Sequence, residues 1–161
     1  MIIDCGGDWL NEALAWKANA VVITHAHPDH ADGLKRGAAC PVYATREPWK
    51  LIGGFPIRDR FTIWPKRKFL IAGMTFVAFS VEHSLRAPAV GYRVTAGRTS
   101  IFYCPDLVYI HDRQAALKGI AAYIGDGATI SRSFIRRRGD RLFGHAAVSQ
   151  QLGWCALLPR S

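Results

Sequence analysis

The 161-residue sequence lacks any C-x-x-C pair, and its four cysteines, Cys5, Cys40, Cys104 and Cys155, are scattered along the chain. It also lacks a charged and then apolar leader, so the cysteines are interpreted as small buried residues of a reduced, cytoplasmic protein. No apolar run reaches about 18 residues, the length that a membrane-spanning helix needs. We therefore expect a soluble cytoplasmic protein with no membrane partner.

Acidic residues are in short supply: 12 aspartates and glutamates face 21 lysines and arginines, which gives a formal net charge of +9. Such an excess favours an anionic partner, either a small phosphate ester or nucleic acid, and a solvated basic surface is an equal alternative. Half of the residues are hydrophobic, which is enough for a sizeable core. A chain of this length predicts a single domain over residues 1–161.

The expected secondary structure is mixed. Short buried strands are predicted at residues 1–3 and 20–23, with a helix between them that Asp8 caps. This helix would carry three apolar side chains on one side: Leu10, Leu14 and Trp16. Further strands, mostly antiparallel, are predicted at residues 42–45, 61–64, 69–71, 75–81, 90–94, 100–103 and 121–124. Helical patterns return in two ranges, 112–118 and 146–152.

A cluster of histidines, THAHPDHADGL, follows the second of these strands. On an extended segment, His25 and His27 point to one side. Asp29 and His30 follow a bend at Pro28 and face a second point nearby. Neutral imidazoles with a carboxylate suit zinc, and also manganese or iron, in a catalytic site that keeps one position open for water. The spacing therefore predicts a metal site, with a hydrogen-bonded polar loop as the alternative.

Six ordered motifs carry a resemblance to a known family: IIDCGG, THAHPDHADGL, VEHSLRAPAVGYRV, IFYCPD, GDGAT and GHAAVSQQL. Together they resemble the metallo-β-lactamase-fold hydrolases along almost the whole chain. The third and sixth are most similar to the transfer-RNA 3′-processing ribonucleases and the cyclic phosphodiesterase of that fold. The resemblance implies an α/β (α+β) protein, a four-layer αββα sandwich with helices outside two facing mixed sheets. It also implies hydrolysis of a phosphodiester by a metal-activated water.

Carried over residue by residue, the resemblance implies two metal positions. The first ion would be bound by His25, His27 and His83, and the second by Asp29 and His30. Asp106 would bridge the two ions. His83 ends an alternating strand and Asp106 follows another, so both lie at strand ends where a site can assemble. Zinc is the expected cofactor, as one or two ions, with manganese or iron as alternatives.

The resemblance also implies roles for Asp4 and His145, and the hypothesis of a phosphodiester hydrolase gives a second role to Asp29. Asp29 would orient the attacking water, and His145 would protonate the leaving oxygen or stabilise charge on it. A neighbour of a helix N-terminus is the alternative interpretation of His145. Asp4 would support the histidine loop without binding metal. His111 lies on no motif and is interpreted as a solvated residue.

Two basic stretches interleave cations with aromatic residues, one at residues 58–68 and one at residues 132–141, which includes Phe134. Such a pattern binds single-stranded nucleic acid or another phosphorylated ligand by stacking and pairing, and solvated loops are the favoured alternative. The second stretch lies between GDGAT and GHAAVSQQL, two motifs that should converge on the site.

The sequence departs from the family at both ends. A strand hairpin usually precedes IIDCG and a further histidine usually follows the strand after the GH helix, and neither stands in this sequence. The resemblance thus implies a sandwich that is incomplete at its N-terminal edge and C-terminus, and a second metal position short of one ligand. An open sheet edge would invite a homodimer. Two other functions stay open: a lactone, thioester or β-lactam hydrolase, and an inactive metal-binding remnant.

Overall fold

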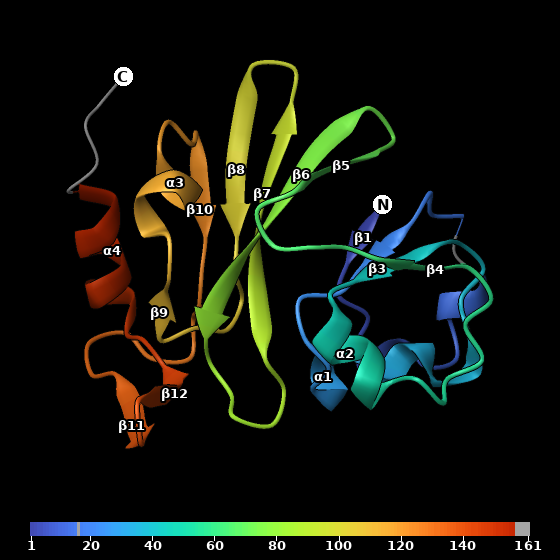
Figure 1. Cartoon of the computed structure of the whole chain (residues 1–161), viewed down its shortest axis with the longest axis horizontal. Helices are drawn as coiled ribbons and strands as arrows, with labels where there is room; N and C mark the ends of the chain where they lie inside the picture. Colours follow the sequence, from blue (N-terminus) through green and yellow to red (C-terminus); the bar gives the residue numbers. More distant parts are fainter. Residues whose placement is uncertain (16, 157–161) are drawn as a thin grey trace.

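The fold is taken from a computed structural model, which describes residues 1–15 and 17–156 (Figure 1). A four-stranded sheet has the order β1-β2-β3-β4, and every neighbouring pair in it is parallel. Its strands are β1 (Ile2–Ile3), β2 (Val21–Val22), β3 (Val42–Ala44) and β4 (Arg60–Thr62). The resemblance implied two mixed sheets, and this one is purely parallel because turns or helices connect each strand to the next across the sheet.

A second sheet of six strands follows in the chain, with the order β10-β8-β7-β6-β5. The sixth strand, β9, pairs with the C-terminal end of β6. Its strands are β5 (Lys68–Ile71), β6 (Met74–Glu82), β7 (Ala89–Ala96), β8 (Thr99–Tyr103), β9 (Tyr109–Ile110) and β10 (Ala122–Ile124). All pairs are antiparallel except β8 with β10, so this sheet is mixed. The prediction of a mostly antiparallel middle of the chain is confirmed.

Helices cover the outer face of each sheet. The α-helices are α1 (Pro28–Ala31), α2 (Arg46–Leu51), α3 (Arg113–Leu117) and α4 (Val148–Ala156), and the 3-10 helices are η1 (Gly7–Trp9), η2 (Ala13–Ala15) and η3 (Asp32–Arg36). In Figure 1, α3 and α4 lie on one side of the six-stranded sheet, and the four-stranded sheet with α1 and α2 lies on the other. No helix in the described residues has the length and apolar character that crossing a bilayer requires.

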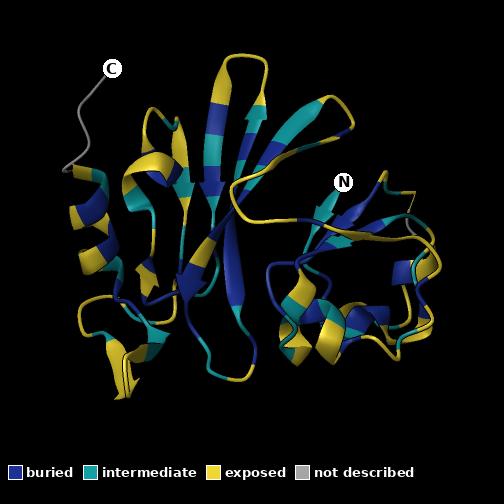
Figure 2. Cartoon of the chain, in the orientation of Figure 1, coloured by how far each residue is buried: buried dark blue, intermediate teal, exposed yellow. Residues whose placement is uncertain are grey.

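Three hydrophobic clusters correspond to the interfaces between the layers. One packs β6 and β8 against α3 and α4 and includes Phe102, Leu117 and Trp154. A second packs the parallel strands against the helices that precede and follow them. The third lies between the sheets, where Phe76 and Tyr92 are fully buried. The expected αββα sandwich is therefore confirmed, and Figure 2 shows the buried strands enclosed by more exposed helices and loops.

The helix predicted after Asp8 is wrong. Gly6 is the N-cap of the short 3-10 helix η1, and Asp8 lies inside it. Leu14 stays 51% exposed, so this segment has no buried apolar stripe, and helix propensity alone does not hold such a short helix in water. Trp16, which we placed on the same helix, lies outside the described residues.

The favoured interpretation of residues 132–141 as a solvated loop is confirmed in its solvation, since nearly all of these residues are exposed, but the segment is not a loop. This segment forms a two-stranded antiparallel ribbon, β11 (Phe134–Arg138) and β12 (Arg141–His145), joined by a two-residue turn. Gly139 begins that turn with φ +59, a conformation in which glycine is favoured. The Gly-Asp pair between two runs of similar length is the signal in the sequence that predicts this hairpin.

Candidate metal centre

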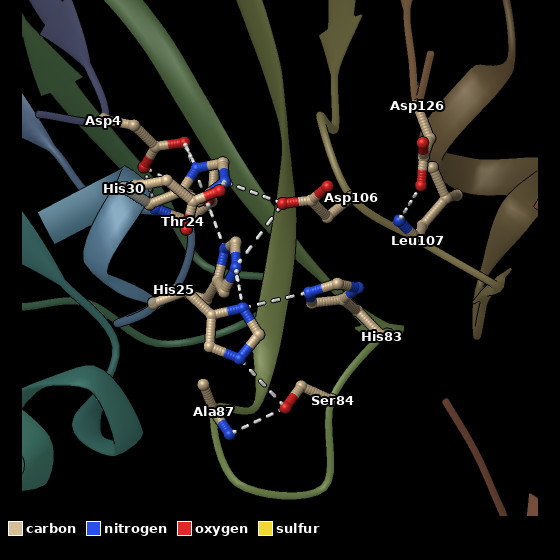
Figure 3. Close-up of polar contacts among 12 residues, drawn as sticks. Asp4, Thr24, His25, His30, His83, Ser84, Ala87, Asp106, Leu107 and Asp126 are labelled. Carbon is tan, nitrogen blue, oxygen red and sulfur yellow. Dashed lines mark hydrogen bonds and ion pairs between the residues drawn. The ribbon is translucent and has the colours of Figure 1, made fainter. Parts of the chain in front are cut away.

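Histidine and aspartate side chains from separate segments converge at one end of the two sheets (Figure 3). His25 lies three residues after β2, His83 follows β6 directly, and Asp106 lies three residues after β8. Tertiary hydrogen bonds hold the end of β2 against β7, because the Tyr92 hydroxyl donates to the carbonyl oxygen of Ile23 at 2.7 Å. The site is thus assembled from both halves of the sandwich.

Three imidazoles form the first cluster, called here the three-histidine group: His25, His27 and His83. His27 Nδ1 lies 3.0 Å from His25 Nε2 and 3.2 Å from His83 Nε2. His27 is the N-cap residue of α1, and Pro28 at the first helical position turns the chain away from the cluster. The expected bend at Pro28 is therefore the start of a helix, which holds Asp29 and His30 on its first turn.

In His25 and His83, the ring nitrogen that points away from the centre of this group is hydrogen-bonded. These hydrogen bonds fix which nitrogen of each ring carries the proton. His83 Nδ1 donates to the carbonyl oxygen of Gly144 at 3.1 Å, so His83 Nε2 carries a lone pair. His25 Nδ1 lies 3.0 Å from Thr24 Oγ1, whose hydroxyl lies 2.8 Å from a carboxylate oxygen of Asp4. Convergent lone pairs at these distances repel each other unless a cation or a proton lies between them. The donor set therefore fits a metal ion such as zinc, which accepts three histidines and an open position.

Asp106 and His30 form a second cluster beside the first. His30 Nε2 lies 2.7 Å from Asp106 Oδ2, and the same oxygen lies 3.5 Å from His25 Nε2, so Asp106 stands between the two clusters as expected of a bridge. Asp29 Oδ2 lies 3.4 Å from His30 Nε2, but its side chain is 78% exposed. Asp29 thus borders the second cluster and belongs to none of the compact ligand groups found in the described residues.

Asp4 lies behind the histidines of the two clusters and is hydrogen-bonded to the segment that carries them. Its carboxylate accepts hydrogen bonds from the backbone N–H of Thr24 at 2.8 Å and from His30 Nδ1 at 2.9 Å. Asp4 has φ +62, a conformation that aspartate tolerates better than most residues do. The buried carboxylate therefore orients His25, through Thr24, and His30 directly, and leaves His30 Nε2 to face Asp106.

The electrostatics separate the two clusters. Burial lowers the pKa of each imidazole of the three-histidine group, and with the neighbouring histidines it lowers the pKa of His25 to about 2. Burial acts on His30 in the same direction, but hydrogen bonds to Asp106 and Asp4 outweigh it and raise the pKa of His30 to about 10. Without metal, the three-histidine group is neutral and ready to bind a cation, whereas a cation at His30 must first displace a proton.

His145 closes the site from the β11–β12 ribbon. His145 Nδ1 donates to Asp126 Oδ2 at 2.7 Å, which leaves Nε2 free for a substrate. Asp126 is buried, and its carboxylate also accepts the backbone N–H groups of Leu107 and Ala128 at 3.1 and 2.8 Å. Sequence reasoning missed Asp126, although it lies in the motif GDGAT that we expected to converge on the site. His145 Nδ1 also lies 3.6 Å from Asp106 Oδ1, so His145 is the nearest further imidazole to the second cluster.

His111 lies apart from these clusters. It is 52% exposed at the side chain, and its Nε2 lies 2.9 Å from Glu82 Oε1. Glu82 precedes the candidate ligand His83, and its other carboxylate oxygen accepts a hydrogen bond from Arg141 Nε at 3.1 Å. His111 belongs to no compact ligand group among the described residues. Its partner Glu82 fastens the ribbon to the end of β6.

Gly144 makes the junction between this ribbon and His83, and we expect its replacement by alanine to destabilise the protein. Its φ is +118, and an added Cβ would meet the carbonyl oxygen of Phe134. Strained backbone alone costs about 1–3 kcal/mol, which corresponds to a fall in melting temperature of roughly 2–12 °C for a chain of this size, and the contact of the added Cβ with Phe134 adds to that loss. Thermal unfolding followed by circular dichroism measures the change.

The matched control is Gly97→Ala, in the turn between β7 and β8. Gly97 also has a positive φ, +56, but an added Cβ there has no atom within 4 Å. The control therefore carries backbone strain without the close approach. Equal melting temperatures for the two variants would contradict the importance of the Gly144 contact.

Comparison with known proteins places this geometry in a family. The family described as the beta-lactamase superfamily domain matches residues 1–161. The chain is 26% identical over 114 residues to an exodeoxyribonuclease, YycJ, of Bacillus anthracis, an alignment that covers 66% of this chain and 43% of that protein.

Solved structures share the fold. A diphosphatase from the PhnP family matches with a TM-score of 0.67 and 20% identity, over 98% of this chain and 64% of that one. Zinc-bound PqqB from Methylobacterium extorquens matches with a TM-score of 0.64 and 20% identity, over 80% of this chain and 56% of that one. This chain thus spans between about two fifths and two thirds of the length of these relatives. Because the family match spans residues 1–161, which include the sandwich and the histidine motif, the chain belongs to the beta-lactamase superfamily domain family. The similar solved structures show that it has the metallo-β-lactamase fold.

Proposed function

We propose that this chain is a metal-dependent hydrolase that cleaves phosphodiesters. The observation that carries the proposal is the position of His145, which is held by Asp126 at 2.7 Å and lies against the ligand cluster through Asp106. A histidine fixed in this way is suited to give a proton to a leaving oxygen. The names of two relatives, an exodeoxyribonuclease and a diphosphatase, support a phosphorus-oxygen bond as the target.

The metal would be held by the three-histidine group, with His30 and Asp106 available to a second ion. Zinc is the proposed ion, supported by the nitrogen-rich donor set and by the zinc in the PqqB structure, with manganese or iron as alternatives. When bound, such an ion lowers the pKa of water to about 7 and polarises a phosphoryl oxygen. The substrate would be a phosphate ester or another small anion, or a nucleic acid.

The protein's own residues then have distinct tasks. Asp29, on the first turn of α1 and mostly exposed, would accept a hydrogen bond from the attacking water and orient it. His145 would donate its Nε2 proton to the leaving oxygen and keep its Nδ1 proton, which is hydrogen-bonded to Asp126, whose carboxylate stabilises the charged ring before the transfer. Asp4 keeps the ligand imidazoles oriented and takes no part in proton transfer.

The test is hydrolysis by metal-reconstituted protein that is folded by circular dichroism. With zinc or manganese, we expect turnover of bis(p-nitrophenyl) phosphate and of a cyclic or linear nucleotide diester. A folded, metal-loaded protein that cleaves none of these refutes the proposal. Turnover of lactones or thioesters with phosphodiesters untouched would favour a carbonyl hydrolase. One tightly bound metal without any turnover would favour an inactive metal-binding protein.

A further inference from the structure

We infer that one face of the β11–β12 ribbon binds a single strand of nucleic acid and leads it to the scissile phosphodiester. The inference rests on the proposed function and names the substrate class and its binding surface. It starts from the register of the ribbon, in which Phe134 pairs with His145, Arg136 with Phe143, and Arg138 with Arg141.

Directly paired residues in an antiparallel ribbon point to the same face, and every second residue along a strand does so too. His145 therefore shares its face with aromatic and arginine side chains in alternation. The members of this surface, called here the His145 face, are Phe134, Arg136, Arg138, Arg141, Phe143 and His145. A proposed proton donor thus stands at the end of a track of two aromatic rings and three cations.

A pocket lies along this track. It has a volume of about 590 Å³ and is lined by four residues of this face, Phe134, Arg136, Phe143 and His145, together with Arg132, Ser133, Ile135 and Gly144. Its volume lies within the range of about 300–1,000 Å³ that is usual for ligand pockets. The pocket therefore places a bound group directly beside His145.

Three side chains of this pocket, those of Phe134, Arg132 and Arg136, are neither packed in a hydrophobic cluster nor ion-paired among the described residues. Phe134 is 62% exposed and packs into no hydrophobic cluster of the described chain. Arg132 and Arg136 form no ion pair with a described carboxylate, so their charge is available to a ligand. All five residues of β11 are exposed, as Figure 2 shows for the ribbon at the lower edge of the molecule. An exposed ring among unpaired cations is a surface that an anionic, stackable ligand stabilises.

The ribbon is also fastened to the metal centre. Arg141 donates to Glu82, and the backbone N–H of Gly144 donates to the carbonyl oxygen of His83 at 2.8 Å, while His83 Nδ1 donates back to Gly144. These contacts hold the His145 face in register with a metal ligand. A strand bound on the ribbon would therefore arrive at the catalytic groups in a defined position.

The alternation of rings and cations favours a single strand over a duplex or an acidic peptide. Unpaired bases stack on aromatic side chains, and the phosphates between them pair with arginines. In a duplex the bases are paired and stacked on each other, so the ring of Phe134 would have no partner. An acidic peptide would satisfy the arginines without using the aromatic rings.

The test compares Phe134→Ala and Arg136→Ala with Arg98→Ala as the matched control. Arg98 is an exposed arginine in the turn between β7 and β8, at the opposite end of the sheet. Its replacement by alanine removes the same charge as Arg136→Ala does. Two substrates are used, a single-stranded oligonucleotide and bis(p-nitrophenyl) phosphate. We expect the ratio of their kcat/KM values to fall about tenfold to a hundredfold in each ribbon variant, from the cost of losing one stacked base or one charged contact. Arg98→Ala should keep the wild-type ratio.

Binding gives a second readout that does not need hydrolysis. Fluorescence anisotropy with a labelled single strand on metal-depleted protein should show weaker binding by both ribbon variants. It should also show a salt dependence reduced by about 0.7 in slope for Arg136→Ala, the value for one phosphate contact on a single strand. A duplex of the same sequence should compete poorly.

The outcomes separate the inference from the proposed function. Ribbon variants that match Arg98→Ala in ratio and affinity, or equal competition by the duplex or by an acidic peptide, would overturn the inference while hydrolysis by the wild type stands. A wild type that binds the strand through Phe134 and Arg136 but cleaves no phosphodiester would overturn the proposed function and leave the ribbon as a binding surface.

Discussion

Replacement of His27 by alanine is expected to abolish metal retention during dialysis and, with it, hydrolysis. His27 Nδ1 lies within 3.2 Å of both other nitrogens of the three-histidine group, so its loss leaves two ligands that no longer surround a position. A catalytic zinc site needs three protein ligands besides its open position. Metal analysis of the dialysed variant, beside an assay of bis(p-nitrophenyl) phosphate cleavage, measures both losses.

His30→Ala is the contrasting variant, and we expect it to keep roughly one metal per chain, since the three-ligand set remains intact. His30 lies in the second cluster, paired with Asp106 at 2.7 Å and with Asp4 at 2.9 Å. Its removal takes one imidazole from that cluster. Circular dichroism checks that both variants are folded. This control is needed because His30 also contacts the buried Asp4.

Equal metal loss in the two variants would contradict this order. It would mean that the two positions are occupied together and that a further ligand completes the second one. His145 is the candidate within the chain, since His83, Asp106 and His145 form a third compact ligand group. A residue from a partner chain is the other source, and a mass measurement of the assembly under the same conditions separates the two.

His145→Ala is expected to lower kcat by about 10²–10⁴-fold for substrates with a poor leaving group, the usual contribution of a positioned proton donor. The loss should be much smaller for bis(p-nitrophenyl) phosphate, whose phenolate leaves without a proton. Parallel kinetics on an alkyl or nucleotide diester and on the aryl diester measure the difference. Metal content should equal that of the wild type.

Asp126→Asn tests the orientation of the same ring. The amide is neutral, so it no longer stabilises a charged imidazole, and its NH2 replaces one of the two oxygens that accept from His145 Nδ1 and from the backbone N–H groups of Leu107 and Ala128. We expect the same dependence on leaving group as in His145→Ala, with a reduction of at least about tenfold for the poor leaving group. A variant that loses activity equally on both diesters, or that loses metal, would instead assign His145 to the ligand set.

The sequence by itself determined the family, the layer architecture and most of the elements. A strand such as Val21–Val22, which is buried on both faces, can be predicted from its residues because a strand buried in this way needs continuous apolar side chains. The closeness of the candidate ligands within THAHPDH could also be predicted from the sequence, since neighbouring residues on a turn stay close in any fold. Short-range chemistry of this kind is encoded locally, and the motif alone predicts a metal site.

The tertiary structure decided what depends on contacts between distant segments. Residues 8–16 carry a helical pattern with apolar residues on one side, but Leu14 on that side stays exposed, and the part that is described forms two short 3-10 helices. Asp126 and His145 are 19 residues apart in the chain, and only the docking of the ribbon on His83 brings them to 2.7 Å beside the ligands. Local residues set the propensity of each segment, whereas burial and long-range hydrogen bonds, which a single sequence does not display, select the partner of each side chain.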